Sequence, residues 1–458
     1  MTTTNSLLCR LSRRLALAIA AIGMSATAFS QASFDQMKPF GFVTVSSRTD
    51  ASKTYNFTAG GVLTPDAKAA GAVVLQSDGE GVDMRSKVAN AISRNKVIIL
   101  DGSNGDFTIS SKIDLSGITG KTIIGINKAR LCTKWFVTDE IKALLDAKNV
   151  KNASTSSGGG TLSNGQKITE EAEYLTRNIL LAKYGNENYR SSGIFFIQNS
   201  SNIAIRNITF VGPGSIDVSG NDLISIYGSH HIWVDHCDFI DGIDGNLDIT
   251  QKADFNTVSW CTFSYTDRSY MHQNTNLIGS SDSETVNYLN TTMAYNVWGK
   301  GCRARMPMAR VGKIHVLNNF YDCKGNGTVC INPRKNSEFL IEGNYFSKDI
   351  SKIFDQSSAK AYVWSSTNVI ARSGISKPSS SGTVTVPYAY TLQPANDMPN
   401  ALTQHAGATL SFGNETAVIS ITSDAAPSSN DKYNILGQKV SASQKGLIIR
   451  NGRKIFIK

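Results

Sequence analysis

The feature that most constrains the fold is a strand-like segment that recurs through the centre of the chain and ends each time in an aromatic residue. Successive terminal aromatic residues lie 29, 24, 35, 23 and 25 positions apart. A register near 24 residues is typical of a solenoid, in which each coil adds one turn plus loops of variable length. We therefore predict an all-β solenoid. The six segments are Ile203–Phe210, Ile232–Phe239, Asn256–Phe263, Thr291–Trp298, Ile314–Tyr321 and Phe339–Phe346.

The alignment of these segments predicts a stacked column of side chains. The residue two before each terminal aromatic residue is, in order, Ile208, Cys237, Cys261, Asn296, Asn319 and Asn344. Equivalent positions of a solenoid lie over one another, so stacked asparagines can pass amide hydrogen bonds between coils at a bend. The two cysteines either stack as buried thiols or form a disulfide. Stacked thiols are favoured, because coils about 4.8 Å apart are marginal for a disulfide.

The segment before the repeats predicts a cap for the solenoid. Apolar residues recur at helical spacing over 84–92, and strands are expected at Val97–Leu100 and Thr122–Ile124. A short helix here would cover the open hydrophobic end, which an unfinished stack needs for solubility. The segments 153–165 and 376–383 are rich in small polar residues, and we interpret them as loops.

The two ends of the chain differ from the centre. Residues 1–28 have the basic start, the short apolar run and the small-residue cleavage point of a secretory signal. A membrane anchor is the alternative, but the apolar run is far shorter than the roughly 20 residues of a span. We expect the solenoid at 29–415, and a linker with a small β-hairpin tail at 416–458, turning at Asn451-Gly452. The protein is predicted to be secreted, with a periplasmic or surface location left open.

The charge and the cysteines limit the class of protein. The formal net charge of +10 favours attraction to a polyanion. Nucleic acid is a poor candidate, because no recognised binding motif occurs and export is expected. An acidic cell-wall polysaccharide fits better, and we expect a monomer with no membrane span after signal cleavage. Six cysteines would remain in the exported protein. They permit disulfides, but no CxxC pair occurs, which argues against a zinc site.

Two charged motifs carry the chemistry. Arg305-Met-Pro-Met-Ala-Arg310 offers two guanidinium groups at fixed spacing, and Asp244-Gly-Asn-Leu-Asp248 offers two carboxylates. An enzyme that removes a proton beside a sugar carboxylate needs cations to hold the developing anion. It also needs carboxylates to hold a divalent metal. Each motif is weak alone, but together they indicate a lyase that acts on an acidic polysaccharide.

Over roughly residues 38 to 413 the chain resembles the pectate lyase family of right-handed parallel β-helices. The first two motifs that carry the resemblance are a strand entry and an aromatic-aliphatic-Asp-His signature. The others are the metal segment, an A-R-x-P-x-x-R run and a supporting Gly-containing segment. In order of the chain, apart from the last, they are Lys121–Gly125, Ile232–His236, Asp244–Asp248, Ala304–Arg310 and Leu277–Asp282.

The resemblance implies a calcium site and two functional arginines. Calcium would be bound by Asp222, Asp244 and Asp248, and Gly220 stands where the family often has a further acidic residue. Calcium accepts six to eight oxygen ligands, so water or substrate could complete the set. Arg305 would lie next to the C5 hydrogen of galacturonate. Arg310 would hold a substrate carboxylate.

The chain departs from the family between the metal segment and the arginines. The family places a substrate-binding lysine there. Counting from one side, this position falls on Arg268, and counting from the other it falls on Asn274, with an insertion that contains Tyr270-Met271-His272 between them. Arg268 could still bind a carboxylate. We interpret His236 as structural and Trp233 as a packing residue.

The implied reaction is β-elimination of α-1,4-polygalacturonate to 4,5-unsaturated oligogalacturonides. Arginine is an awkward base, because proteins very rarely deprotonate it. Either Arg305 removes the C5 proton, or it stabilises the developing anion while hydroxide removes the proton. One alternative function is a pectin lyase acting on methylated substrate. The other is a non-catalytic β-helix that binds glycan.

Overall fold

A computed structural model describes residues 38–47, 53–148, 161–162, 165–185, 192–216, 221–325, 327, 329–412, 432–433, 446–450 and 453–457. The chain forms two compact units, Met1–Phe412 and Gly413–Lys458. In the second unit β28 (Gly446–Arg450) pairs antiparallel with β29 (Arg453–Ile457) and with β27 (Lys432–Tyr433). The expected signal, the Asn451-Gly452 turn, Gly220 and most of the 153–165 loop lie outside the described residues. None of the helices in the described ranges is both long and apolar enough to cross a membrane.

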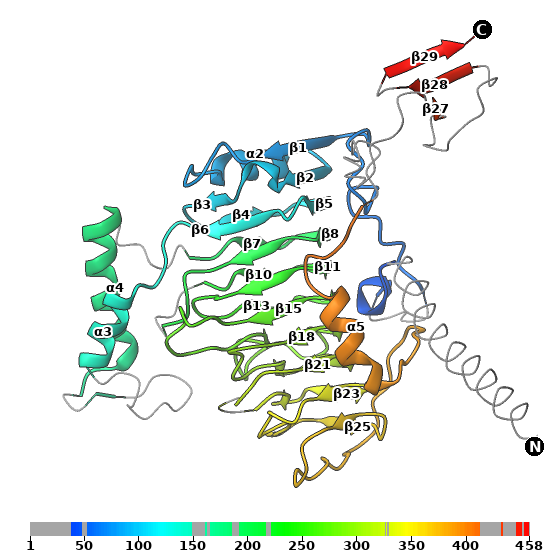
Figure 1. Ribbon diagram of the computed structural model, residues 1–458. Coiled ribbons are helices and arrows are strands. Elements are labelled where there is room, and N and C mark those ends of the chain that lie inside the picture. The colour runs from blue at the N-terminus through cyan, green and yellow to red at the C-terminus, as the bar shows by residue number, and fades with distance from the viewer. Residues whose placement is uncertain are drawn as a thin grey trace, which may run out of the picture. The chain divides into compact units, whose positions relative to one another are not determined.

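The first unit is a stack of coils built on three parallel sheets (Figure 1). The ten-stranded sheet contains β1 (Ala72–Gln76), β2 (Val97–Asp101), β5 (Thr119–Ile126), β8 (Ser201–Arg206), β11 (His230–Asp235), β14 (Asn256–Ser259), β17 (Thr291–Ala294), β20 (Lys313–Leu317), β23 (Glu338–Glu342) and β25 (Ala361–Trp364). The nine-stranded sheet contains β3 (Phe107–Ile109), β6 (Arg130–Thr133), β9 (Thr209–Val211), β12 (Asp238–Ile240), β15 (Thr262–Ser264), β18 (Val297–Trp298), β21 (Phe320–Tyr321), β24 (Tyr345–Phe346) and β26 (Val369–Ile370). The seven-stranded sheet contains β4 (Ile113–Ser116), β7 (Phe195–Gln198), β10 (Ile224–Tyr227), β13 (Leu247–Thr250), β16 (Leu277–Ile278), β19 (Met308–Ala309) and β22 (Asn332–Pro333). The predicted β-helix is confirmed.

Each repeated segment is a strand, a bend and a second strand rather than one continuous strand. In the second segment, β11 ends at Asp235, His236 adopts a φ of 48°, and β12 begins at Asp238. The equivalent residue of every other segment also has a positive φ. These residues are Asn207, Trp260, Tyr295, Asn318 and Gly343. The period was therefore correct, but periodicity alone did not separate the two strands of each segment.

The predicted asparagine column is confirmed and extends one coil further than expected. The side-chain amide of Asn296 donates to Asn319 Oδ1 over 3.1 Å, and that of Asn319 donates to Asn344 Oδ1 over 2.9 Å. Asn344 donates in turn to Asn368 Oδ1 over 3.0 Å. All four are buried, so the column satisfies polar groups that would otherwise be costly at the bend. Cys237 and Cys261 are buried free thiols.

The terminal aromatic residues stack in a second column inside the coils. Neighbouring rings from Phe210 to Trp364 have centroids 4.4 to 5.7 Å apart and lie nearly parallel. This column and the branched aliphatic residues around it form the main core. The predicted cap is confirmed, because α2 (Arg85–Arg94) buries Val88, Ala91 and Ile92 against that core.

Other helices were not predicted from the sequence. α3 (Asp139–Ala147) and α4 (Ile168–Tyr184) lie between β6 and β7 and stand beside the stack in Figure 1. α5 (Met398–His405), preceded by η5 (Ala395–Asp397), packs on Phe320 of the nine-stranded sheet. Two further 3₁₀ turns, η1 (Gly41–Thr44) and η2 (Gly102–Asn104), lie near the N-terminal end of the described chain. The apolar residues of these helices belong to insertions, which carry no solenoid period.

Candidate active site

Four consecutive loops on one side of the stack carry the charged residues of interest. Each loop joins a strand of the nine-stranded sheet to a strand of the seven-stranded sheet. Asp222 lies before β10, Asp244 before β13, residues 265–276 before β16, and Arg305 before β19. Because these strands pair in parallel register, the loops follow one another along the stack. Residues up to 83 positions apart in sequence therefore meet at one place. We call these four loops the loop column.

Asp222 of the loop column and Asp248 of β13 converge over a glycine of the loop column. A Cβ placed on Gly245 would lie 2.6 Å from Asp222 Oδ1 and 3.3 Å from Asp248 Oδ1. Asp222 Oδ2 accepts a hydrogen bond from Ser225 Oγ over 2.9 Å, but Oδ1 is buried and has no hydrogen-bond partner among the described residues. Asp248 Oδ1 accepts from the Leu277 backbone N–H over 2.9 Å. A side chain at 245 would fill this cradle, which suits a small cation bound by hard oxygen ligands.

The electrostatics of the two carboxylates favour an added positive charge. Burial raises the pKa of Asp248 to about 7, against the opposing effect of the Arg305 guanidinium. Burial, and then the nearby charges of Asp248 and Asp244, raise the pKa of Asp222 well above its ordinary value. Like charges in a buried site disfavour the ionised form, and a cation would reverse that effect.

The raised pKa values predict an unusual pH dependence of stability in the chelated protein. The pKa of Asp248 rises on folding from an ordinary 3.8 to about 7, so the folded state holds more protons than the unfolded state between these values. The free energy of unfolding should therefore decrease as the pH rises from about 4 to about 7. We expect Asp248→Asn to weaken this decrease in thermal melts with chelator. Identical pH profiles for the two proteins would contradict the prediction.

The third predicted ligand, Asp244, is engaged by a histidine. His272 Nε2 lies 3.0 Å from Asp244 Oδ1. Asp244 still contributes to the raised pKa values of both Asp222 and Asp248, so its charge lies near them. Among the described residues, no three histidine, cysteine, aspartate or glutamate side chains already form a complete metal-ligand set. Asp222 and Asp248 are thus the converged part of the site, and Asp244 stands at its edge.

Arg305 is fixed by its backbone at the same place. It has a φ of 58° and precedes a cis Met306-Pro307 bond. Its carbonyl accepts hydrogen bonds from the Asn276 N–H over 2.7 Å and from Thr275 Oγ1. Its charge lowers the pKa of both Asp222 and Asp248, so the guanidinium lies close to the paired carboxylates. The structure therefore brings Arg305, Asp222 and Asp248 together, with Asp244 at the edge of the site.

Arg310 lies further along, beyond β19. Its Nε donates to Asp282 Oδ1 over 2.8 Å and its Nη1 donates to the Gly279 carbonyl over 3.0 Å. Both partners belong to the segment Leu277–Asp282, which explains why this segment and the arginine run occur together. Arg310 is therefore beside the site, but it is already bound to a carboxylate of the protein.

Neither candidate for the lysine position points plainly at the aspartates. The Arg268 guanidinium stacks 4.4 Å above the Phe136 ring, and its Nη1 lies 3.6 Å from Asp241 Oδ2. The Asn274 amide nitrogen lies 3.0 Å from His272 Nε2. The residue that reaches Asp244 is His272, which sequence reasoning treated only as part of an insertion. His272 lies far in sequence from both the metal segment and the arginine run, so neither motif indicated a role for it.

His236 and Asp235 belong to a buried network away from the loop column. Asp235 accepts from Arg206 over 2.8 Å, from Ser259 Oγ over 2.7 Å, and lies 2.8 Å from His236 Nδ1. The His236 ring is fully buried and stacks on Trp260. This geometry accords with a structural role for His236.

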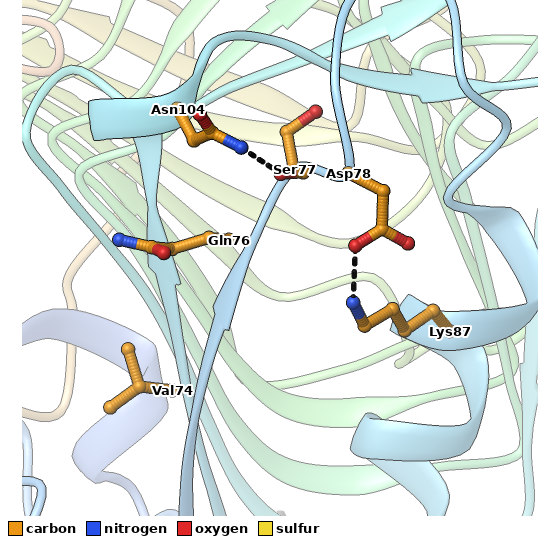
Figure 2. Close-up of a pocket in the computed structure, with 6 residues that line it drawn as sticks. All are labelled: Val74, Gln76, Ser77, Asp78, Lys87 and Asn104. Atoms are coloured by element: carbon orange, nitrogen blue, oxygen red, sulfur yellow. Dashed lines mark hydrogen bonds and ion pairs between the residues drawn. The ribbon is translucent and has the colours of Figure 1, made fainter.

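A hollow elsewhere on the surface does not coincide with the site. Figure 2 shows Lys87 paired with Asp78 over 2.6 Å, and the Asn104 amide donating to the Ser77 carbonyl. These polar groups bind one another, which leaves them little to offer a ligand. The hollow is lined by Val74, Gln76, Ser77, Asp78, Lys87 and Asn104.

The fold and the site together define a parallel β-helix protein in which aspartates and arginines gather along one column of loops. A family model described as "Pectate lyase" matches residues 185–411. Pectate lyase A of Aspergillus niger is 31% identical over 258 residues, which cover 54% of this chain and 74% of that protein. The chain belongs to the pectate lyase family.

Two further comparisons describe its relatives. The pectate trisaccharide-lyase of Thermotoga maritima is 40% identical over 139 residues, or 28% of this chain and 36% of that protein. A solved pectate lyase from Bacillus sp. N165, in complex with trigalacturonate, aligns with a TM-score of 0.48 at 19% identity, covering 81% of this chain and 98% of that one. The chain spans 36% of the Thermotoga relative and 50% of a probable pectate lyase B from Aspergillus terreus.

Proposed function

We propose that the protein is a secreted pectate lyase that cleaves α-1,4-polygalacturonate by calcium-assisted β-elimination. The observation that carries the proposal is the convergence of Asp222 and Asp248 over Gly245, with the Arg305 charge acting on both. The names of the relatives support the same reaction. The formal net charge of +10 supports an acidic polysaccharide as the substrate. The signal-like residues 1–28 support export.

Asp222, Asp244 and Asp248 are the residues that would hold calcium. The bare Asp222 Oδ1 and the absent Cβ of Gly245 fit such an ion, because calcium prefers carboxylate oxygens and needs space around them. Calcium bound here would reduce the negative charge of the substrate carboxylate and make the neighbouring C5 proton easier to remove. The remaining ligand positions are left to water and to the uronate.

Arg305 is the proposed catalytic residue. Either neutral Arg305 or hydroxide takes the C5 proton, the electron pair of the C5–H bond forms the C4–C5 double bond, and the C4–O4 bond breaks with its electrons passing to the leaving sugar oxygen. The leaving oxygen then takes a proton, so that no water is consumed. A guanidinium next to C5 stabilises the negative charge that develops in this step. Arg310 is proposed to bind a second carboxylate of the substrate, after exchange with Asp282. Arg268 is a weaker candidate, because it stacks on Phe136.

The test is the absorbance of unsaturated ends released from polygalacturonate, with and without a calcium chelator. We expect product with calcium and a loss of about 10²-fold or more in rate after chelation, because the carboxylates then lack their cation. Restoring calcium should restore the rate.

The same assay separates the alternatives. Product that forms from methylated pectin and is insensitive to chelator would indicate a pectin lyase. No product from either substrate would indicate a non-catalytic glycan-binding β-helix. Either result would overturn the proposal.

A further inference from the structure

The loop between β15 and β16 carries an insertion that delivers a histidine to the site. His272 Nε2 lies 3.0 Å from Asp244 Oδ1, and its backbone has a φ of 60°. Its side chain is only 20% exposed. A non-glycine residue with positive φ persists where the surrounding structure holds it.

A buried carboxylate organises the base of this loop. Asp241 is fully buried and accepts hydrogen bonds from the Thr266 N–H over 2.7 Å and from Ser269 Oγ over 2.8 Å. Thr266 Oγ1 donates to its second oxygen, and Arg268 lies 3.6 Å from the same atom. These contacts satisfy Asp241 fully, so the first half of the loop is fixed to the coil below.

The second half of the loop is fixed by a neighbouring coil and by the helices. The backbone N–H groups of Tyr270 and Met271 both donate to the Ser215 carbonyl. The Tyr270 hydroxyl donates to Asp146 of α3 over 2.6 Å. Tyr270 and Met271 are buried in an apolar cluster with Ile141 and Leu145 of α3. The chain immediately before His272 is thus fixed to the neighbouring coil and to α3.

We propose that His272 is a positioning residue that orients Asp244 for calcium, and this rests on the proposed function above. A ligating carboxylate is normally held by an outer hydrogen bond, which fixes its rotamer and thereby strengthens metal binding. The Asp244–His272 contact supplies such an outer partner at ion-pair distance, with Nε2 3.0 Å from Oδ1. The fixed loop gives it the pre-organised support that such a contact needs.

The contact leaves Asp244 able to bind a cation. A carboxylate has two oxygens and about four acceptor positions, and His272 lies beside Oδ1. Within the described ranges no side chain forms an ion pair with the other oxygen, and the charge of Asp244 already acts on Asp222 and Asp248. Holding Asp244 at this place also costs repulsion between three carboxylates, which calcium would relieve. His272 therefore supports the ligand rather than replacing it.

The test measures calcium affinity directly, by isothermal titration calorimetry on the full-length protein without substrate. We expect His272→Ala to raise the Kd for calcium about 10-fold to 100-fold, the usual effect of losing an outer partner of a metal ligand. His272→Gln keeps an N–H donor and should recover most of the affinity. His230→Ala makes the same substitution on β11, outside the loop column, and should leave the Kd unchanged. A thermal melt of each variant establishes that it is folded.

Kinetics distinguish positioning of the metal ligand from direct substrate binding. At saturating calcium, His272→Ala should recover wild-type kcat and KM for polygalacturonate to within about threefold, since its defect lies in calcium affinity. A KM that remains raised at saturating calcium would overturn the proposal in favour of a substrate contact. Unchanged calcium affinity in His272→Ala would also overturn it. Tighter binding would mean that His272 competes with the cation, and would overturn it too.

The proposal and the function on which it rests fail in different ways. If the wild-type protein binds calcium and releases unsaturated ends, but His272→Ala behaves like it, only the role of His272 is wrong. If the wild-type protein neither binds calcium nor releases product, the proposed function is wrong and the role of His272 falls with it.

Discussion

Replacing Arg305 with alanine should lower kcat on polygalacturonate by about 10³-fold at saturating calcium. Removing one group that stabilises charge in a transition state typically costs 10²-fold to 10³-fold, and a base contributes a similar factor. Arg305 is the residue of the arginine run whose charge opposes the raised pKa of both Asp222 and Asp248. The rate of formation of unsaturated ends measures the effect.

A matched control separates this effect from a general loss of positive charge. Arg372→Ala removes an exposed arginine outside the loop column and should retain at least half of the wild-type rate. Arg305→Lys keeps the charge but loses the planar fork, so we expect a smaller loss of about 10²-fold. If Arg305→Ala kept more than a tenth of the wild-type kcat while calcium binding was normal, Arg305 would not be the catalytic residue.

The sequence predicted those parts of the fold that repeat. Phe210, Phe239 and Phe263 are equivalent because each coil needs an apolar side chain at this position, and equivalent positions of successive coils lie over one another. The ladder from Asn296 to Asn344 follows from the same argument. α3 and α4 do not repeat, so no period indicated them, although their apolar residues have helical spacing. Such insertions can be predicted only from local helical spacing, because the solenoid period does not include them.

The candidate site was predicted to the extent that short motifs carry it. Asp248 and Arg305 lie in recognisable runs, and both were found. Asp222 has no local pattern around it and was reached only through the family resemblance. His272 was missed because an insertion displaces it from any expected position, and its partner Asp244 is 28 residues away. Only the stacking of neighbouring loops brings these two side chains together.

The Asp222→Asn substitution should weaken calcium binding on the order of 10²-fold, because it removes charge from a ligand whose Oδ1 has no hydrogen-bond partner in the described part of the chain. The same substitution should raise the melting temperature of the chelated protein, since it removes one of several mutually repelling, partly buried carboxylates. Most surface substitutions neither weaken calcium binding nor raise the melting temperature. Weaker calcium binding together with a higher melting temperature in chelator is the result expected of a cation site whose carboxylates repel one another without the ion.

Urea unfolding with chelator gives the metal-free stability, and the increase at a fixed calcium concentration gives the stabilisation by calcium. At a calcium concentration of 100 times the wild-type Kd, binding should add about 2.7 kcal/mol to the free energy of unfolding of the wild-type protein. A variant that binds 100-fold more weakly should gain only about 0.4 kcal/mol under the same conditions. Asp267→Asn changes an exposed aspartate in the loop column and should follow the wild type. An Asp222→Asn protein that gained the full calcium stabilisation would exclude Asp222 from the metal site, and with it the convergence over Gly245 on which the proposed chemistry depends.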